Sequence, residues 1–246
     1  GSAISRSSDD REVTNMSEKY SAYYDRAVVA DAVEGQQHRE IIGGMWEEIG
    51  TLQMDMLLDA GLQPQHRLLD IGCGSLRLGV KAASYLDPEN YWGTDLNENL
   101  LDAGYEREII PLGLRDRLPR ENLVADEDFD FTGVPDTIDF AIAQSVFTHL
   151  PLSFLRKCLK NLAGHLKGEA TLFVTVFLAP EPQFDEPLQQ SHGGVTTFPN
   201  RDPYHYTLSQ LTEVTEGLPW HAEFIGEWHH PRNQQLVKYR LEQDEI

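Results

Sequence analysis

Apolar side chains in the N-terminal quarter of the chain recur at steps of three and four residues, which is the spacing of one helix face. This pattern predicts helix from Glu18 to Ala60. The helix is expected to end there because Gly61 follows it and Pro64 prevents its continuation. The recurring apolar positions are Ile41, Ile42, Met45, Trp46, Ile49, Leu52, Met56 and Leu57.

Short apolar runs alternate with helical patterns through the middle of the chain. Such alternation predicts βαβ units and an α/β fold with a mainly parallel sheet. The most strand-like run is rich in β-branched and aromatic residues and covers 170–178. The expected strands are 67–71, 91–95, 122–125, 137–143 and 170–178, and the expected helices are 76–86, 97–110 and 153–166.

The C-terminal part has a different pattern. Residues 180–206 contain many of the prolines and predict a long loop. A helix capped by Thr207 or Ser209 is expected to follow this loop. The last two strands, 222–228 and 235–241, are joined by a short connection, which implies an antiparallel pair.

The chain has 246 residues, and roughly 100–200 residues per domain is usual. We therefore expect one domain at 63–246, preceded by a helical segment at 18–62. Residues 1–17 are polar and rich in Ser and Asp, so they are expected to be disordered.

Composition narrows the possible partners. The chain has 20 Lys and Arg against 40 Asp and Glu, and this net charge of −20 disfavours a nucleic-acid substrate. No apolar run approaches the roughly 18 residues of a membrane span, and no signal-peptide pattern is present. Two cysteines and nine scattered histidines disfavour a disulfide framework and a metal site. We expect a soluble, cytoplasmic protein that acts on a small molecule.

A glycine-containing turn follows the first predicted strand. Gly72 and Gly74 let backbone amides approach a ligand closely, because glycine lacks Cβ and tolerates positive φ. In a dinucleotide site a third glycine should follow Gly74 by three residues, and that position is Arg77. Asp70 stands before the turn, where its charge would repel a phosphate but attract an amino or sulfonium group. The motif therefore favours a cationic ligand over a tight turn without a ligand.

Two further acids follow the next strands. Asp95 ends the second strand, where a carboxylate accepts hydrogen bonds from vicinal ribose hydroxyls, or else caps the following helix. Asp126 follows the third strand, where it is a candidate acceptor for an adenine amino group. Other acids surround it at 127, 128 and 130, so the register of that contact stays open.

The run Leu69-Asp70-Ile71-Gly72-Cys73-Gly74, together with Asp95 and residues 139–150, resembles the class I S-adenosylmethionine-dependent methyltransferases. The resemblance spans about 65–241. It implies a Rossmann-like, seven-stranded, mostly parallel sheet with helices on both faces and an antiparallel last strand. Residues 44–53 resemble a lid helix of one bacterial subgroup of that family, so the segment at 18–62 is expected to be a helical lid.

The resemblance also implies the cofactor, S-adenosylmethionine, and its binding residues. Asp70, Gly72 and Gly74 would line the methionine part, and Asp95 would hold the ribose. Arg77 departs from the small residue that is frequent at its position. The full set of cofactor-binding residues that we expect is Asp70, Gly72, Cys73, Gly74, Asp95, Leu96, Asp126, Gln144 and Ser145.

Methyl transfer to a hydroxyl or an amine requires removal of a proton, and histidines are the candidate bases. His149 follows the fourth strand, and His205 lies in the long loop. Tyr204 and Tyr206 either wall a substrate pocket or pack this loop down. Arg232 is either an anchor for an anionic substrate group or part of a surface turn.

We therefore expect in-line methyl transfer to an oxygen, nitrogen or sulfur atom of a small molecule. Three alternatives remain open from the residues alone: transfer of another group from the same cofactor, a non-catalytic cofactor-binding domain, and a nicotinamide-dependent oxidoreductase. The displaced third glycine and Asp70 argue against the oxidoreductase. Oligomeric state is not indicated.

Overall fold

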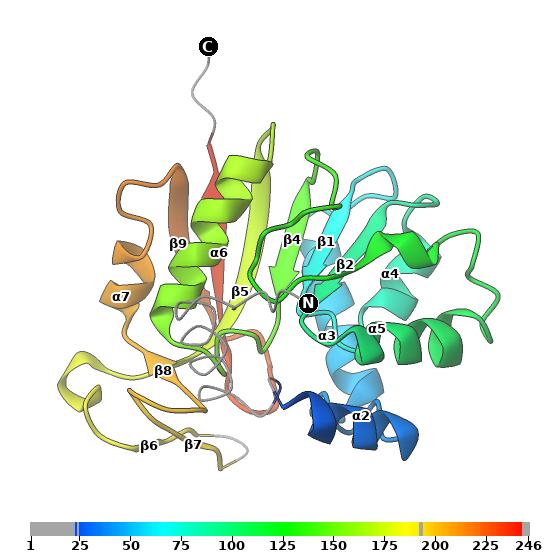
Figure 1. Ribbon diagram of the computed structural model, residues 1–246. Helices are drawn as coiled ribbons and strands as arrows, with labels where there is room; N and C mark the ends of the chain where they lie inside the picture. The colour runs from blue at the N-terminus through cyan, green and yellow to red at the C-terminus, as the bar shows by residue number, and fades with distance from the viewer. Residues whose placement is uncertain (1–22, 24, 192–193, 243–246) are drawn as a thin grey trace, which may run out of the picture.

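One sheet occupies the centre of the protein in the computed structural model, which describes residues 23, 25–191 and 194–242 (Figure 1). The order of its main strands is β3-β2-β1-β4-β5-β10-β9. Neighbours from β3 to β5 are parallel, whereas β10 is antiparallel to both β5 and β9. The bounds are β1 Leu68–Ile71, β2 Tyr91–Asp95, β3 Leu123–Ala125, β4 Phe140–Ala143, β5 Ala170–Leu178, β9 Trp220–Gly226 and β10 Gln235–Leu241.

This arrangement confirms the expected mostly parallel sheet with an antiparallel last strand. A two-residue strand of the long loop, His205–Tyr206, also pairs with β5, so the sheet has eight strands where seven were expected. Helices cover both faces, and each face has its own apolar core. Leucines of α6 (Leu152–His165) pack on one face of β4 and β5, and side chains of α3 (Trp46–Asp59), α4 (Gly79–Tyr85) and α5 (Glu98–Gly104) pack on the other. No helix in the described ranges is both long and apolar enough to span a membrane.

The single helix expected from Glu18 to Ala60 is wrong. Two helices, α2 (Arg26–Glu34) and α3, are separated by residues 35–45. Left-handed backbone at Gly43, with φ of 97°, and at Gly44, with φ of 62°, interrupts the helical path. The apolar spacing misled because Ile42 packs against the glycine turn and not on a helix face. The expected tail at 1–17 lies outside the described residues.

Other elements differ from expectation mainly at their ends. The helix expected from residue 76 begins at Gly79, because Leu76 has a φ of 73° that no α-helix accommodates. The helix expected at 97–110 is α5 continued by a π-helical turn, Tyr105–Ile109. A short 3-10 turn, Arg120–Asn122, leads into β3.

The long loop carries short elements of its own. A 3-10 turn, Glu181–Gln183, precedes the hairpin of β6 (Leu188–Gln189) and β7 (Thr196–Thr197), and β8 (His205–Tyr206) extends the sheet beside the end of β5. Helix α7, Leu208–Glu213, follows with Thr207 as its N-cap. Of the two caps that the sequence offered, Thr207 is correct, and its hydroxyl accepts from the Gln210 N–H.

Candidate functional site

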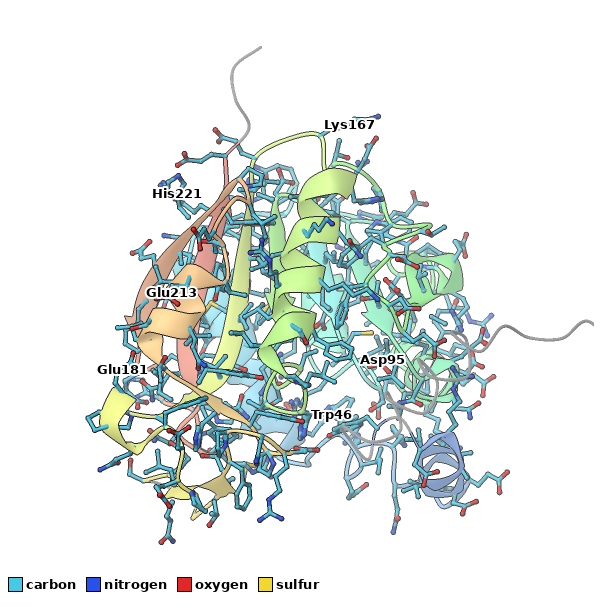
Figure 2. All side chains as sticks on the ribbon, turned by 60° about the vertical axis from the view of Figure 1, so that its left-hand side comes forward. Trp46, Asp95, Lys167, Glu181, Glu213 and His221 are labelled. Atoms are coloured by element: carbon cyan, nitrogen blue, oxygen red, sulfur yellow. The ribbon has the colours of Figure 1, made fainter. Side chains whose placement is uncertain are left out.

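A pocket opens at the carboxyl ends of β1, β2 and β4. Figure 2 shows Asp95 and Trp46 at this end of the molecule, with Lys167 and His221 at the opposite end. The pocket encloses about 740 Å³, part of which is open to solvent. Its lining comprises Tyr23, Ile42, Gln53, Asp70, Gly72, Cys73, Gly74, Arg77, Leu78, Asp95, Leu96, Leu100, Gln144, Ser145, Val146, His149 and Leu150. Every expected cofactor residue except Asp126 therefore lies on this one pocket, and so does His149.

The glycine turn has no room for larger side chains. Gly72 and Gly74 have φ of 69° and 55°, in the region that disfavours side chains. A Cβ on Gly72 would lie 2.4 Å from Cγ2 of Val146, and one on Gly74 would lie 2.8 Å from Cγ2 of Ile42. The backbone of the turn is thus exposed to the pocket at positions that only glycine fits.

Asp95 holds the turn in place. Its Oδ2 accepts the Gly74 N–H at 2.9 Å, and its Oδ1 accepts the Asn97 N–H at 2.8 Å. Burial raises the pKa of Asp95 to about 6, although these two hydrogen bonds oppose the shift. A carboxylate offers about four lone-pair sites, so two remain for ligand hydroxyls.

Asp70 is a buried acid at the end of β1. Its Oδ2 accepts the Tyr91 hydroxyl at 2.8 Å. Burial raises its pKa to about 7, and the hydrogen bond and the charge of Arg77 only partly counter this. Because no cation of the described chain lies within ion-pairing distance, the carboxylate is suited to a cationic ligand group.

Two pocket residues outside the expected cofactor-binding set, Arg77 and Gln53, carry unpaired buried atoms. Arg77 donates from Nη1 to the Gly44 carbonyl and from Nη2 to Oε1 of Gln144, both at 2.8 Å. Its Nε has no partner in the described structure, and neither does Oε1 of Gln53 in α3. Arg77 is 6% exposed and Gln53 is 4% exposed. Buried polar groups without a partner are costly, so these two atoms are the donor and the acceptor of the lining residues that still have a hydrogen bond to make.

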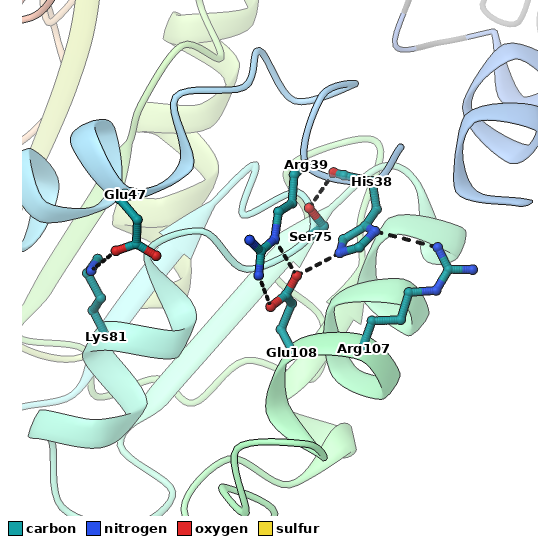
Figure 3. Close-up of polar contacts among 7 residues, drawn as sticks. All are labelled: His38, Arg39, Glu47, Ser75, Lys81, Arg107 and Glu108. Atoms are coloured by element: carbon teal, nitrogen blue, oxygen red, sulfur yellow. Dashed lines mark hydrogen bonds and ion pairs between the residues drawn. The ribbon is translucent and has the colours of Figure 1, made fainter. Parts of the chain in front are cut away.

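Residues 38–44, which we call the strap, lie over the glycine turn. Glu108 accepts from Nε2 of His38 at 2.7 Å and from Nε of Arg39 at 2.8 Å, and Ser75 donates to the His38 carbonyl at 2.6 Å (Figure 3). Lys81 pairs with Glu47 of α3 at 2.9 Å in the same view. These contacts fasten residues 38–47 to the glycine turn, to α4 and to the π-helical turn after α5.

His149 is paired with an acid from the long loop. Its Nδ1 lies 2.7 Å from Oδ1 of Asp202, and its ring meets that of Tyr23 edge-on at 4.9 Å. The Tyr204 N–H donates to the Thr148 carbonyl at 2.7 Å and joins the loop to the segment that carries His149. The sequence analysis did not identify Asp202 as a site residue. The one feature that could have indicated it is its position beside Pro203 in a long loop.

The other loop residues proposed from the sequence do not line the pocket. His205 is fully buried, with Nδ1 at 2.8 Å from Oγ1 of Thr197 and Nε2 at 2.8 Å from the Phe184 carbonyl. Both ring nitrogens are therefore engaged in packing the loop. Tyr204 and Tyr206 are buried and stacked, and the Tyr206 hydroxyl donates to the carbonyl of Phe147. Of the two roles that the sequence left open for these tyrosines, the geometry fits loop packing.

Asp126 and Arg232 also lie outside the pocket lining. The Asp126 carboxylate accepts the N–H groups of Asp128, Asp130 and Phe131, at 3.2, 3.0 and 2.9 Å, and so orders the turn after β3. Arg232 donates from Nη2 to the Gly43 carbonyl of the strap at 2.9 Å. No group of three or more His, Cys, Asp or Glu side chains with metal-binding geometry occurs in the described part of the chain.

Comparisons with known proteins identify methyltransferases as similar in sequence pattern and in fold. Residues 69–172 match the model of a methyltransferase domain family. A magnesium protoporphyrin IX methyltransferase from Synechocystis PCC 6803, solved with bound S-adenosylmethionine, has a TM-score of 0.56 at 13% identity and covers 98% of this chain and 100% of its own. An S-adenosylmethionine-dependent methyltransferase from Aquifex aeolicus has a TM-score of 0.56 at 16% identity, with 77% and 89% covered. A third, from Methanosarcina mazei, has a TM-score of 0.52 at 19% identity, with 75% and 94% covered.

Proposed function

We propose that this chain is a class I S-adenosylmethionine-dependent methyltransferase that methylates an oxygen, nitrogen or sulfur atom of a small molecule, with His149 as the base. The observation that carries the proposal is the His149–Asp202 pair, 2.7 Å apart, with His149 on the same pocket as the glycine turn. We propose 63–246 as the catalytic domain and 18–62 as its lid.

The pocket residues suit the cofactor group by group. Asp70 and Oε1 of Gln53 offer acceptors to the methionine ammonium, and the unpaired Nε of Arg77 offers a donor to its carboxylate. Asp95 retains acceptor capacity for the ribose hydroxyls. The lid thus contributes Gln53 directly to the cofactor site.

When bound, the cofactor supplies an electrophilic methyl group on a positively charged sulfur. His149 would accept the proton that the attacking hydroxyl or amine loses, through Nε2. Asp202 would keep the ring proton on Nδ1 and stabilise the imidazolium that forms. The strap and α3 would exclude water from the reacting atoms.

We expect His149→Ala to lower turnover by about 10²–10⁴-fold while the affinity for S-adenosylhomocysteine stays within two-fold, since a positioned base contributes about that much. Asp202→Asn should lower turnover less and shift the pH profile of kcat. Turnover is measured by mass spectrometry on a metabolite extract supplied with methyl-labelled cofactor, where the product gains one methyl group. His221→Ala, on an exposed strand residue, is the control. Wild-type turnover in His149→Ala would contradict a basic role, and a product that gains a different group would contradict methyl transfer.

We expect Asp95→Ala to weaken S-adenosylhomocysteine binding by ten-fold or more, as hydrogen bonds to a charged group contribute roughly 1.5–3 kcal/mol. Asp126→Ala is the comparison, because its carboxylate is engaged with the backbone of its own turn. Calorimetric titration of both variants with S-adenosylhomocysteine distinguishes the ribose contact of Asp95 from the structural role of Asp126. A ten-fold loss in Asp126→Ala would restore the adenine contact expected from the sequence, and unchanged affinity in Asp95→Ala would remove the ribose contact.

A further inference from the structure

Ser145 lies at the end of β4 in an unusual backbone conformation. Its φ of 57° is uncommon for a residue other than glycine. The side chain is partly exposed on the pocket, on the same segment as Val146 and His149. Strained positions of this kind persist only where surrounding contacts enforce them.

A buried threonine fixes the first of these contacts. The Ser145 N–H donates to Oγ1 of Thr175 at 2.8 Å, and Thr175 is fully buried in β5. The Thr175 hydroxyl must donate its own proton, and it does so to Oε1 of Gln234 at 2.7 Å. The amide nitrogen of Gln234 therefore faces Oγ of Ser145, at 2.5 Å.

An arginine fixes the second contact. Nη2 of Arg77 donates to Oε1 of Gln144, so the amide nitrogen of Gln144 is turned toward Oγ of Ser145, at 3.1 Å. Arg77 is always a donor, which rules out the flipped amide.

The serine oxygen thus accepts from two amide N–H groups, one from Gln144 and one from Gln234. A hydroxyl has two acceptor lone pairs and one proton, so both lone pairs are engaged. No acceptor for the remaining proton occurs among the contacts of the described residues. Ser145 is therefore restricted to donating, and the pocket is the open direction.

We propose that Ser145 donates this hydrogen bond to an oxygen atom of the methyl acceptor, and not to the cofactor, which the sequence resemblance had implied as its partner. The inference rests on the proposed function and narrows its substrate class. The substrate would carry a proton-bearing nucleophile for His149 and, on the same molecule, an oxygen acceptor such as a carboxylate, carbonyl or second hydroxyl. Ser145 and His149 share the β4 side of the pocket, whereas the proposed ammonium and ribose partners, Asp70 and Asp95, end β1 and β2.

Paired probes test this proposal. Each pair has the same type of nucleophile, and only one member has a neighbouring oxygen: phenol and catechol, aniline and 2-aminobenzoate, propan-2-ol and lactate. Binding to the S-adenosylhomocysteine complex is measured by NMR titration, and methyl transfer by mass spectrometry. The oxygen-bearing member of at least one pair should bind about three- to ten-fold more tightly to the wild type, the range of one neutral hydrogen bond.

Ser145→Gly should abolish that preference and leave the affinity of the oxygen-free probes and of S-adenosylhomocysteine within two-fold. Glycine tolerates the backbone angle at this position, so the variant should fold. Glu89→Gly, at an exposed position with φ of 69°, controls for relief of backbone strain. Weaker S-adenosylhomocysteine binding in Ser145→Gly would assign the acceptor to the cofactor and overturn the proposal. Absence of any preference in the wild type, or a preference that survives in Ser145→Gly, would also overturn it. Preferential binding without methyl transfer would support the Ser145 contact while contradicting the proposed function.

Discussion

Replacing Asp70 by asparagine is expected to weaken S-adenosylhomocysteine binding at pH 8 by roughly 10- to 100-fold, the size of one buried charge-assisted hydrogen bond. The wild-type carboxyl has a pKa of about 7 in the ligand-free pocket. It must be ionised to hold an ammonium group, so wild-type affinity should fall as the pH is lowered from 8 to 5. The asparagine variant should lose most of this dependence, which calorimetric titration across that range will measure. Asp136→Asn, at an acid paired with Lys167 away from the pocket, is the control. Identical pH profiles in Asp70→Asn and the wild type would exclude Asp70 from the ammonium contact.

The raised pKa of Asp70 also predicts how the stability of the protein depends on pH when no ligand has been added. The folded pKa of Asp70, about 7, lies above its ordinary value of 3.8, so the folded state binds the proton more tightly than the unfolded state. The free energy of unfolding should therefore fall as pH rises from about 4 to about 7. At pH 8 the Asp70→Asn variant should melt above the wild type when no ligand is present, even though it binds the cofactor product more weakly.

Gly104→Ala is expected to destabilise the protein by about 1–3 kcal/mol, as overpacking of a filled interior does. A Cβ on Gly104 would lie 2.6 Å from the Ser75 carbonyl oxygen and 2.7 Å from its carbon. These are backbone atoms of the turn that follows Gly74, so they cannot rotate away as a side chain would. For a chain of this size the loss corresponds to roughly 3–10 °C in Tm, and cofactor affinity should fall with it because the turn is displaced.

Gly164→Ala in α6 is the matched control for Gly104→Ala. A Cβ on Gly164 would meet nothing within 4 Å, so alanine should stabilise this helix by about 0.5–1 kcal/mol. Thermal unfolding with and without S-adenosylhomocysteine measures both variants. A Gly104→Ala protein as stable as the wild type would mean that α5 can shift away from the turn at little cost.

The central strands of the sheet were predictable because β1, β4 and β5 are buried and mostly apolar runs. The run 170–178 matches β5, and 91–95 matches β2. The break between α2 and α3 could not be predicted, because Ile41 and Ile42 continue the helical spacing of apolar residues. In the structure Ile42 packs against the glycine turn instead of a helix face. A pattern of apolar positions reports which side chains are buried, not which partner buries them.

Only the part of the candidate site that lies in one sequence motif could be predicted. Asp70, Gly72 and Gly74 are neighbours in the chain, so their proximity was readable from one motif. Gln53 lines the pocket and Asp202 pairs with His149, and both come from segments that only the folded chain brings close to the motif. The burial of His205 was equally invisible, since nothing in a loop sequence distinguishes a packed imidazole from an exposed one.

The hydrogen bond between Asp95 and the glycine turn has a consequence for binding thermodynamics. The carboxylate is oriented by the N–H groups of Gly74 and Asn97, which belong to the chain itself, so its direction toward a nucleoside is fixed by the fold. Little chain entropy should be lost on association, and affinity should be governed by desolvation of Asp95 and Asp70. A rigid site of this kind selects its ligand mainly by the charge of the ligand, and induced fit contributes little to that selection.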